Sequence, residues 1–96
     1  MNLVIQFETV EDVDEAYHWY ARQHVATGAR FRVAFDEAVA KALEHPDGYE
    51  VLYRETRRVL LRRFPYGIYY RLAGDTLVVI ACLHLRRAPR TWRARS

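Results

Sequence analysis

The stretch Leu77-Val78-Val79-Ile80-Ala81-Cys82-Leu83 contains no polar side chain other than a thiol. A continuous apolar run rich in β-branched residues is typical of a strand buried on both faces of a sheet, because a half-exposed strand would alternate apolar and polar residues. The run is too short to cross a bilayer as a helix. The rest of the chain must therefore supply neighbouring strands and a cover for both faces.

Two β-rich segments precede this run, Val59 to Phe64 and Ile68 to Leu72. Pro65 and Gly67 stand between them and indicate a turn or a bulge, since a proline cannot donate to the hydrogen-bond ladder of a sheet. The tripeptide Ala73-Gly74-Asp75 predicts a tight hairpin turn into the apolar run. The second half of the chain is therefore expected to form three consecutive, mainly antiparallel strands.

The first half opens with a short strand pattern, Leu3 to Phe7, and then becomes helical. Thr9 is expected to cap a first helix, which ends near Gln23 to Ala26. Thr27 is expected to cap a second helix, which ends before Pro46. The apolar face of the second helix consists of Phe31, Ala34, Phe35, Ala38 and Ala42. Because few residues connect the two helices, they should pack as an antiparallel hairpin.

The order of these elements, β-α-α-β-β-β, predicts an α+β fold in which an antiparallel helix hairpin packs on a small, mainly antiparallel sheet. With 96 residues, the chain is long enough for one compact core and too short for two, so residues 1–96 are expected to form a single domain. The sequence shows no signal peptide and no membrane span, which predicts a cytoplasmic protein. The tail 89–96 is polar and basic, a composition common in loosely attached termini.

Charge is distributed unevenly along the chain. Residues 1–56 carry eleven acidic and five basic side chains, whereas residues 57–96 carry ten arginines and one acid, Asp75. The guanidinium group of arginine binds carboxylates and phosphates through paired hydrogen bonds. This asymmetry predicts an anionic partner, either a nucleic acid or an acidic protein segment. An arginine bias on solvated strand faces would give the same composition without any partner.

Several catalytic and cofactor-binding classes find no support in the sequence. The four histidines show no ligand spacing with one another or with Cys82, so no metal site is expected. The isolated glycines form no phosphate-binding loop, and Ser96 is the only serine, which leaves no serine nucleophile. Cys82 lies within the apolar run, where a buried and unreactive thiol is expected. We therefore expect no cofactor.

The segment from Arg57 to Trp92 resembles the RelE/ParE superfamily of toxins. The resemblance is carried by the block Arg63-Phe64-Pro65-Tyr66-Gly67-Ile68-Tyr69-Tyr70, by the Gly74-Asp75-Thr76 turn, and by the ending His84-x-Arg86-Arg87-x-Pro89 with Trp92. It implies the toxin of a type II toxin–antitoxin system, encoded beside a small antitoxin whose C-terminal segment wraps the toxin. Two different activities occur on this fold, so the resemblance does not fix the mechanism.

RelE-like members of this superfamily cut messenger RNA on the ribosome with a cluster of lysines and arginines. The cations hold the scissile phosphate and neutralise the charge that develops on it. Two of the matching positions are Gly67 and Leu85 here, and the sole lysine, Lys41, lies in the expected second helix. ParE-like members lack this cluster and are associated with inhibition of DNA gyrase. The resemblance therefore implies a ParE-like, non-catalytic inhibitor of growth whose target is DNA gyrase.

A ribosome-dependent messenger RNA endoribonuclease remains the alternative, provided that neighbouring residues have rebuilt the cationic cluster. Its catalytic residues would then be Arg62, Arg63, His84 and Arg86. In that case His84 would transfer protons and Arg86 would hold the phosphate. A basic nucleic-acid-binding module without toxin activity is the third possibility.

For the toxin hypothesis, the predicted site consists of contact residues. The two-residue period of a strand places Arg58 and Arg62 on one side and Arg57 and Arg63 on the other. The basic and aromatic end of the chain is expected to engage the antitoxin or the target. The full set of predicted contact residues is Arg57, Arg58, Arg62, Arg63, Arg86, Arg87, Arg90 and Trp92.

Overall fold

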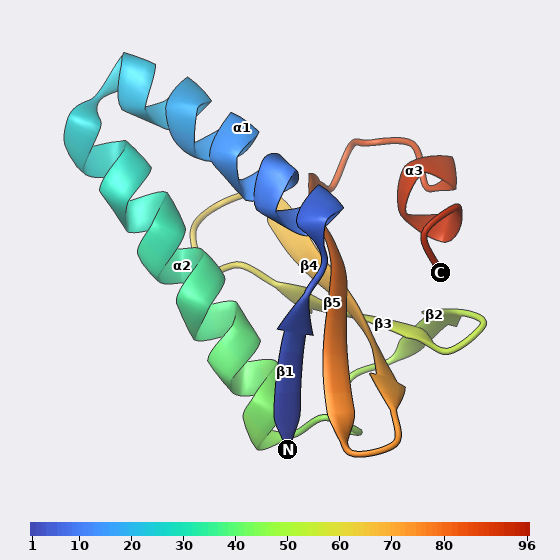
Figure 1. Cartoon of the computed structure of the whole chain (residues 1–96). Coiled ribbons are helices and arrows are strands. Elements are labelled where there is room, and N and C mark those ends of the chain that lie inside the picture. Colours follow the sequence, from blue (N-terminus) through green and yellow to red (C-terminus); the bar gives the residue numbers. More distant parts are fainter.

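The computed structural model describes residues 1–96 and places two long helices on one face of a five-stranded sheet (Figure 1). The elements are β1 (Asn2–Ile5), α1 (Phe7–Gln23), α2 (Val25–Glu44), β2 (Val51–Tyr53), β3 (Thr56–Leu60), β4 (Tyr66–Ala73), β5 (Thr76–His84) and α3 (Arg90–Arg93). The strand order is β1-β5-β4-β3-β2, with β1 parallel to β5 and the other neighbours antiparallel. The predicted α+β fold is confirmed.

The apolar run forms β5, which lies between β1 and β4 and is buried from Leu77 to Leu83. Side chains on one face of β5, including Val79, pack with Phe31 of α2 in the main core. Side chains on the other face form a second cluster with the C-terminal turn. This second cluster consists of Tyr69, Val78, Ile80, Ala81, Leu83 and Trp92. The prediction of a strand covered on both faces is therefore confirmed.

The helix hairpin is confirmed, but neither predicted cap forms. Helix α1 begins at Phe7, and Thr9 is fully buried and donates its hydroxyl to the backbone oxygen of Val79, 3.0 Å away. Helix α2 begins at Val25, directly after an extended His24, so that Thr27 lies inside its first turn. The hydroxyl of Thr9 is used in a contact between α1 and β5, which is why the capping pattern was misleading.

The strand bounds differ from the prediction in several places. Strand β4 begins at Tyr66, so Gly67 lies within the strand and only Pro65 belongs to the connection before it. The opening strand ends at Ile5, and Phe7 belongs to α1. The predicted strand Val59 to Phe64 is β3, Thr56–Leu60, followed by a loop in which Arg63 has a φ of 70°. The short edge strand β2, which pairs with β3, was not predicted. In contrast, the hairpin turn at Gly74 is confirmed, and its φ of 61° is the left-handed conformation that favours glycine.

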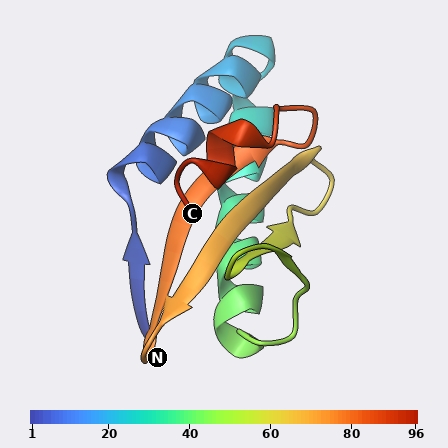
Figure 2. The ribbon, with the colours of Figure 1, turned by 90° about the vertical axis from the view of Figure 1, so that its right-hand side faces the viewer.

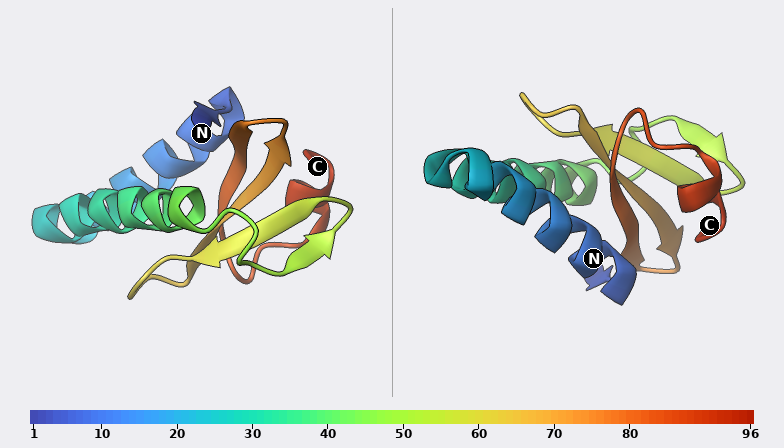
Figure 3. Two further views of the ribbon diagram at one scale, coloured as in Figure 1. Left: turned by 90° about the horizontal axis from the view of Figure 1, so that it is seen from below. Right: turned by 90° about the horizontal axis from the view of Figure 1, so that it is seen from above.

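The C-terminal tail is ordered. Helix α3 and the residues after it lie against the sheet face opposite to α2, as Figure 2 and the two views of Figure 3 show. Trp92 is only 5% exposed there. A basic composition suggested a loose tail, but one buried indole supplies enough apolar area to hold it. None of the helices has the length and apolarity that a membrane span requires.

Candidate functional site: the basic end of the sheet

Two loops meet where β4 begins and β5 ends, and we call them the basic end: residues 61–65 and 85–89. Tyr66 pairs with His84 in the sheet, and the backbone N–H of Leu85 donates to the oxygen of Pro65 at 2.9 Å. The two loops therefore lie side by side. They carry four exposed arginines: Arg62, Arg63, Arg86 and Arg87. Loops held by a rigid scaffold in this way are common places for binding residues.

None of these four arginines forms an ion pair or a side-chain hydrogen bond within the chain. The four ion pairs of the molecule involve Arg32, His45, Arg57 and Arg95. The 61–65 loop is nevertheless fixed, because the ring of Phe64 packs edge-on against Tyr20 and Phe31, with centroid distances of 4.9 and 5.3 Å. Anchored cations without internal partners are available to an anionic partner.

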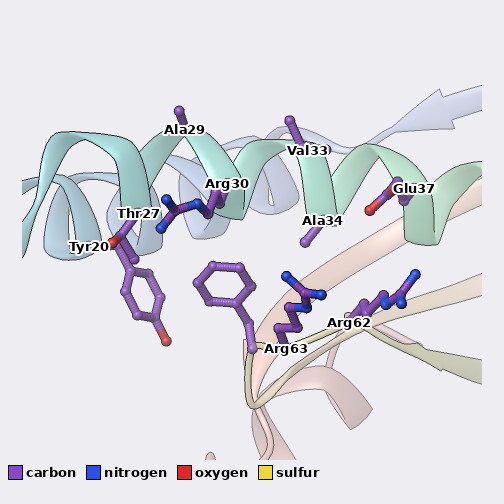
Figure 4. A pocket seen from close by; sticks show the side chains of 10 residues that line it. Tyr20, Thr27, Ala29, Arg30, Val33, Ala34, Glu37, Arg62 and Arg63 are labelled. Atoms are coloured by element: carbon purple, nitrogen blue, oxygen red, sulfur yellow. The ribbon is translucent and has the colours of Figure 1, made fainter.

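A groove of about 760 Å³ separates the 61–65 loop from α2. Figure 4 shows Arg30 on the helix side of this groove and Arg62 and Arg63 on the loop side. Apolar side chains line the groove as well, among them Val33, which is 56% exposed. The lining residues are Tyr20, Thr27, Ala29, Arg30, Val33, Ala34, Glu37, Arg62, Arg63 and Phe64. The groove thus combines an apolar surface with two arginines on the loop wall and with Arg30 and one carboxylate, Glu37, on the helix wall.

The opposite sheet face carries an apolar patch at the basic end. A Cβ atom on Gly67 would lie 3.0 Å from Cγ and Cδ of Arg58 and 3.5 Å from a methyl group of Leu85. Leu60, which pairs with Gly67 across the strands, is 52% exposed, and Leu85 is 40% exposed. Gly67 and Leu85, the two positions at which the resemblance to RelE-like nucleases would imply cations, are therefore neighbours, and the side chain of Arg58 lies beside Gly67.

Few groups here can transfer a proton. The Nδ1 atom of His84 accepts a hydrogen bond from the backbone N–H of Arg86, 3.0 Å away, and its ring lies 5.3 Å from that of Tyr66. Burial, followed by the neighbouring Tyr20, raises the pKa of the Tyr66 phenol. Burial also raises the pKa of the Cys82 thiol, with a smaller effect from Asp12. Tyr66 and Cys82 therefore stay protonated at neutral pH, and no cluster of three metal-ligating side chains occurs.

Four of the eight predicted contact residues lie outside the two loops of the basic end: Arg57 and Arg58 in β3, and Arg90 and Trp92 in α3. The guanidinium of Arg57 donates to the backbone oxygens of Asp47 and Tyr49, at 3.2 and 2.6 Å. Trp92 stacks on Tyr69 with a centroid distance of 4.8 Å and an interplanar angle of 16°. Arg57 thus fastens the turn after α2, and the ring of Trp92 is inside the second cluster. Arg90 is exposed at the start of α3.

Arg30 was not predicted as a site residue, because it stands in the first half of the chain, where acidic side chains outnumber basic ones. Its signal is the helical spacing that places Thr27, Arg30, Ala34 and Glu37 along one stripe of α2, facing the groove. The pairing of Asp12 with Arg95, at 2.6 Å, was not predicted either. No local sequence pattern predicts this contact, because 83 positions separate Asp12 and Arg95.

The comparisons with known proteins agree with this geometry. The model of the family described as "ParE toxin of type II toxin-antitoxin system, parDE" matches residues 7–89. A solved structure described as "Chromosomal ParDE TA system from P. aeruginosa" has a TM-score of 0.78 and 17% identity, and the match covers 88% of this chain and 95% of that one. Curated protein sequences give no match. The chain belongs to the family of ParE toxins of parDE-type toxin–antitoxin systems.

Proposed function

We propose that the chain inhibits growth by binding DNA gyrase through the basic end, and that a cognate antitoxin neutralises it in the cytoplasm. The observation that carries this proposal is the set of four exposed arginines on two adjoining, anchored loops, none of which has an ion-pair partner within the chain. Exposed, preorganised arginines are frequent anchors of protein interfaces. Family membership supports a toxin but does not name its target.

The groove supports an antitoxin partner. A segment that filled it would need apolar side chains against Val33 and Phe64 and carboxylates near Arg30, Arg62 and Arg63. An amphipathic acidic segment has this chemistry, and laying such a segment into a groove is a recurrent mode of peptide recognition. The similar solved structure is described as a ParDE system, which is consistent with a paired protein. The antitoxin therefore covers the loop-side arginines of the basic end.

The apolar patch favours gyrase over messenger RNA as the target. Removing one preorganised donor from a site that stabilises a developing charge costs about a hundredfold in rate. Gly67 and Leu85 stand at two adjoining positions where a RelE-like nuclease would carry cations. The exposed Leu60 adds a further apolar surface beside them. A scissile phosphate placed there would meet methyl groups. The basic end is thus suited to binding rather than to phosphodiester cleavage.

A ribosome-dependent endoribonuclease is the second candidate, supported by one contact. The hydrogen bond from the Arg86 backbone to His84 brings an imidazole to the end that also carries Arg62 and Arg63. Such a cluster would use His84 as the proton-transfer group and Arg86 as the phosphate clamp. The two candidate functions differ in their first effect in the cell. Inhibition of gyrase would change the topology of DNA, whereas a ribonuclease would cut messenger RNA.

The test is to induce the chain in cells without the antitoxin and to follow both events over the first minutes. We expect relaxation of a reporter plasmid while ribosome-bound transcripts keep their ends, and restored growth when the neighbouring antitoxin gene is co-expressed. New transcript ends at codon positions with unchanged plasmid topology would establish the ribonuclease instead. Normal growth of the induced cells would contradict toxin activity altogether.

A further inference from the structure

The free edge of β5 is completed by side chains. Strand β1 pairs with β5 only as far as Ile5 opposite Val79, so beyond this point the edge of β5 that faces away from β4 has no neighbouring strand. The N–H of Cys82 donates to Oδ2 of Asp12 at 3.0 Å, and the oxygen of Ile80 accepts a hydrogen bond from Arg95 at 3.2 Å. A side chain of α1 and a side chain of the tail therefore take the place of a strand.

Asp12 and Arg95 also bind each other. The guanidinium of Arg95 donates to both carboxylate oxygens of Asp12, at 2.6 and 3.3 Å. The side chain of Asp12 is 11% exposed and that of Arg95 is 21% exposed. A two-point contact between an arginine and a carboxylate fixes direction as well as distance, which a lysine cannot do. The end of the chain is thus held at one defined position on α1.

Two further contacts hold the same segment, and we call the three together the C-terminal anchor. Trp92 stacks on Tyr69 of β4, and the hydroxyl of Thr56 in β3 donates to the hydroxyl of Ser96 at 2.7 Å. The anchor thus joins the tail to α1, β4 and β3. Figure 3 shows the C-terminal turn lying across the sheet on the side away from α2.

The anchor determines where one loop of the basic end lies. The loop 85–89 connects the end of β5 to α3, and Arg86 and Arg87 within it are exposed. At its first end the loop is held by the hydrogen bond from Leu85 to Pro65. At its second end it is held only through α3, and hence through the anchor. Releasing the second end would give each loop residue back its conformational freedom, which a target must then remove on binding.

We infer that Asp12 and Arg95 are positioning residues for Arg86 and Arg87, so that the ion pair between α1 and the tail sets the geometry with which the basic end meets its target. This inference rests on the proposed function of the basic end. It assigns a role in toxicity to an acid of the first helix, which itself lies outside the cationic cluster.

The test compares Asp12→Asn with Asp14→Asn in the complete chain. Both change one carboxylate of α1 to an amide, and Asp14 is paired with Arg32 at 2.8 Å in an exposed contact outside the anchor. We expect Asp12→Asn to lower growth inhibition at least tenfold and Asp14→Asn to leave it unchanged. Arg95→Ala should lower growth inhibition to the same extent without any change in α1. The double variant Asp12→Glu/Arg95→Lys keeps both charges but should recover little growth inhibition, because a lysine cannot make the two-point contact.

Tryptophan fluorescence separates a displaced tail from an unfolded chain. In a Trp19→Phe background only Trp92 emits, since the chain has two tryptophans. Asp12→Asn and Arg95→Ala should make Trp92 more accessible to acrylamide while the circular dichroism of the helices is retained. Full growth inhibition by a folded Arg95→Ala variant, when Arg86→Ala/Arg87→Ala is inactive, would overturn the inference and leave the proposed function intact. Full inhibition by both variants would overturn the proposed function as well.

Discussion

Strand β3 and the basic end both carry arginines, and Arg57 of β3 is used in the opposite way to the arginines of the basic end. Arg57 is 22% exposed and donates to two backbone oxygens of the turn after α2, so its charge serves the fold. Arg62, Arg63, Arg86 and Arg87 are exposed and have no partner in the chain. The count of arginines in a segment therefore overstates the number that can contact a target. Arg95 resembles Arg57 in this respect, because its guanidinium binds Asp12 within the chain and so serves the fold.

The largest effect is expected at the aromatic contact that orders the tail. Trp92→Ala should lower the free energy of unfolding by about 3–5 kcal/mol, the usual cost of truncating a buried large aromatic side chain. Urea denaturation measures this loss. Trp19→Ala is the matched control, since Trp19 is 51% exposed on α1 and its removal should cost about 1 kcal/mol at most. Equal losses for the two variants would show that the tail is not anchored through its indole.

The next effect separates function from stability at the basic end. Arg86→Ala/Arg87→Ala should lower growth inhibition about a hundredfold, since an interface arginine that acts as a hot spot contributes about 2 kcal/mol or more. Thermal unfolding should stay within about 0.5 kcal/mol of the parent, because neither side chain has a partner in the chain. Arg22→Ala/Lys41→Ala removes the same charge from exposed helix positions and should remain toxic. Equal toxicity of both double variants would contradict a localised site.

A smaller effect is expected at the turn after α2. Arg57→Ala should lower the free energy of unfolding by about 1–3 kcal/mol, because hydrogen bonds to a charged donor are lost and the backbone oxygen of Tyr49 loses its partner. Arg62→Ala, at an exposed loop position, should change it by about 0.5 kcal/mol or less. Chemical denaturation of the two variants side by side decides whether arginines of neighbouring segments do serve different purposes.

The smallest effect tests the groove. Val33→Asp places a carboxylate on the apolar lining of the groove, where an acidic antitoxin segment would be repelled. The dissociation constant of the antitoxin complex should rise about tenfold, which corresponds to about 1.4 kcal/mol. Val25→Asp, at a position 77% exposed and outside the groove, is the control and should bind as the parent does. Titration calorimetry with the purified antitoxin gives both values.

The parts of the fold that local sequence could predict are those that local forces determine. An uninterrupted apolar run such as β5 is stable only when covered on both faces, and Gly74 supplies the conformation that its hairpin needs. The predicted cap at Thr9 does not form because the hydroxyl of Thr9 donates to the backbone oxygen of Val79, 70 positions away. The strand predicted to end at Phe64 stops at Leu60 because the ring of Phe64 enters the aromatic cluster beneath the helices.

The candidate site was harder to predict than the fold. The arginines of the loops 61–65 and 85–89 were predicted as contact residues, and the structure places the two loops side by side. Nothing in the sequence separates Arg57 from Arg62, however, since the hydrogen bonds of Arg57 depend on the turn at Asp47. Trp92 looked like a contact residue because an aromatic among arginines is typical of interfaces. Its burial depends on Tyr69, which only the folded sheet brings beneath it.

Supercoiling of relaxed plasmid by purified DNA gyrase tests the central claim most directly. We expect the purified chain to inhibit the reaction. Arg86→Ala/Arg87→Ala should require about a hundredfold higher concentration for the same inhibition, and Arg22→Ala/Lys41→Ala should behave as the parent does. Gyrase that supercoils normally at every concentration of a folded chain that arrests growth would contradict the account.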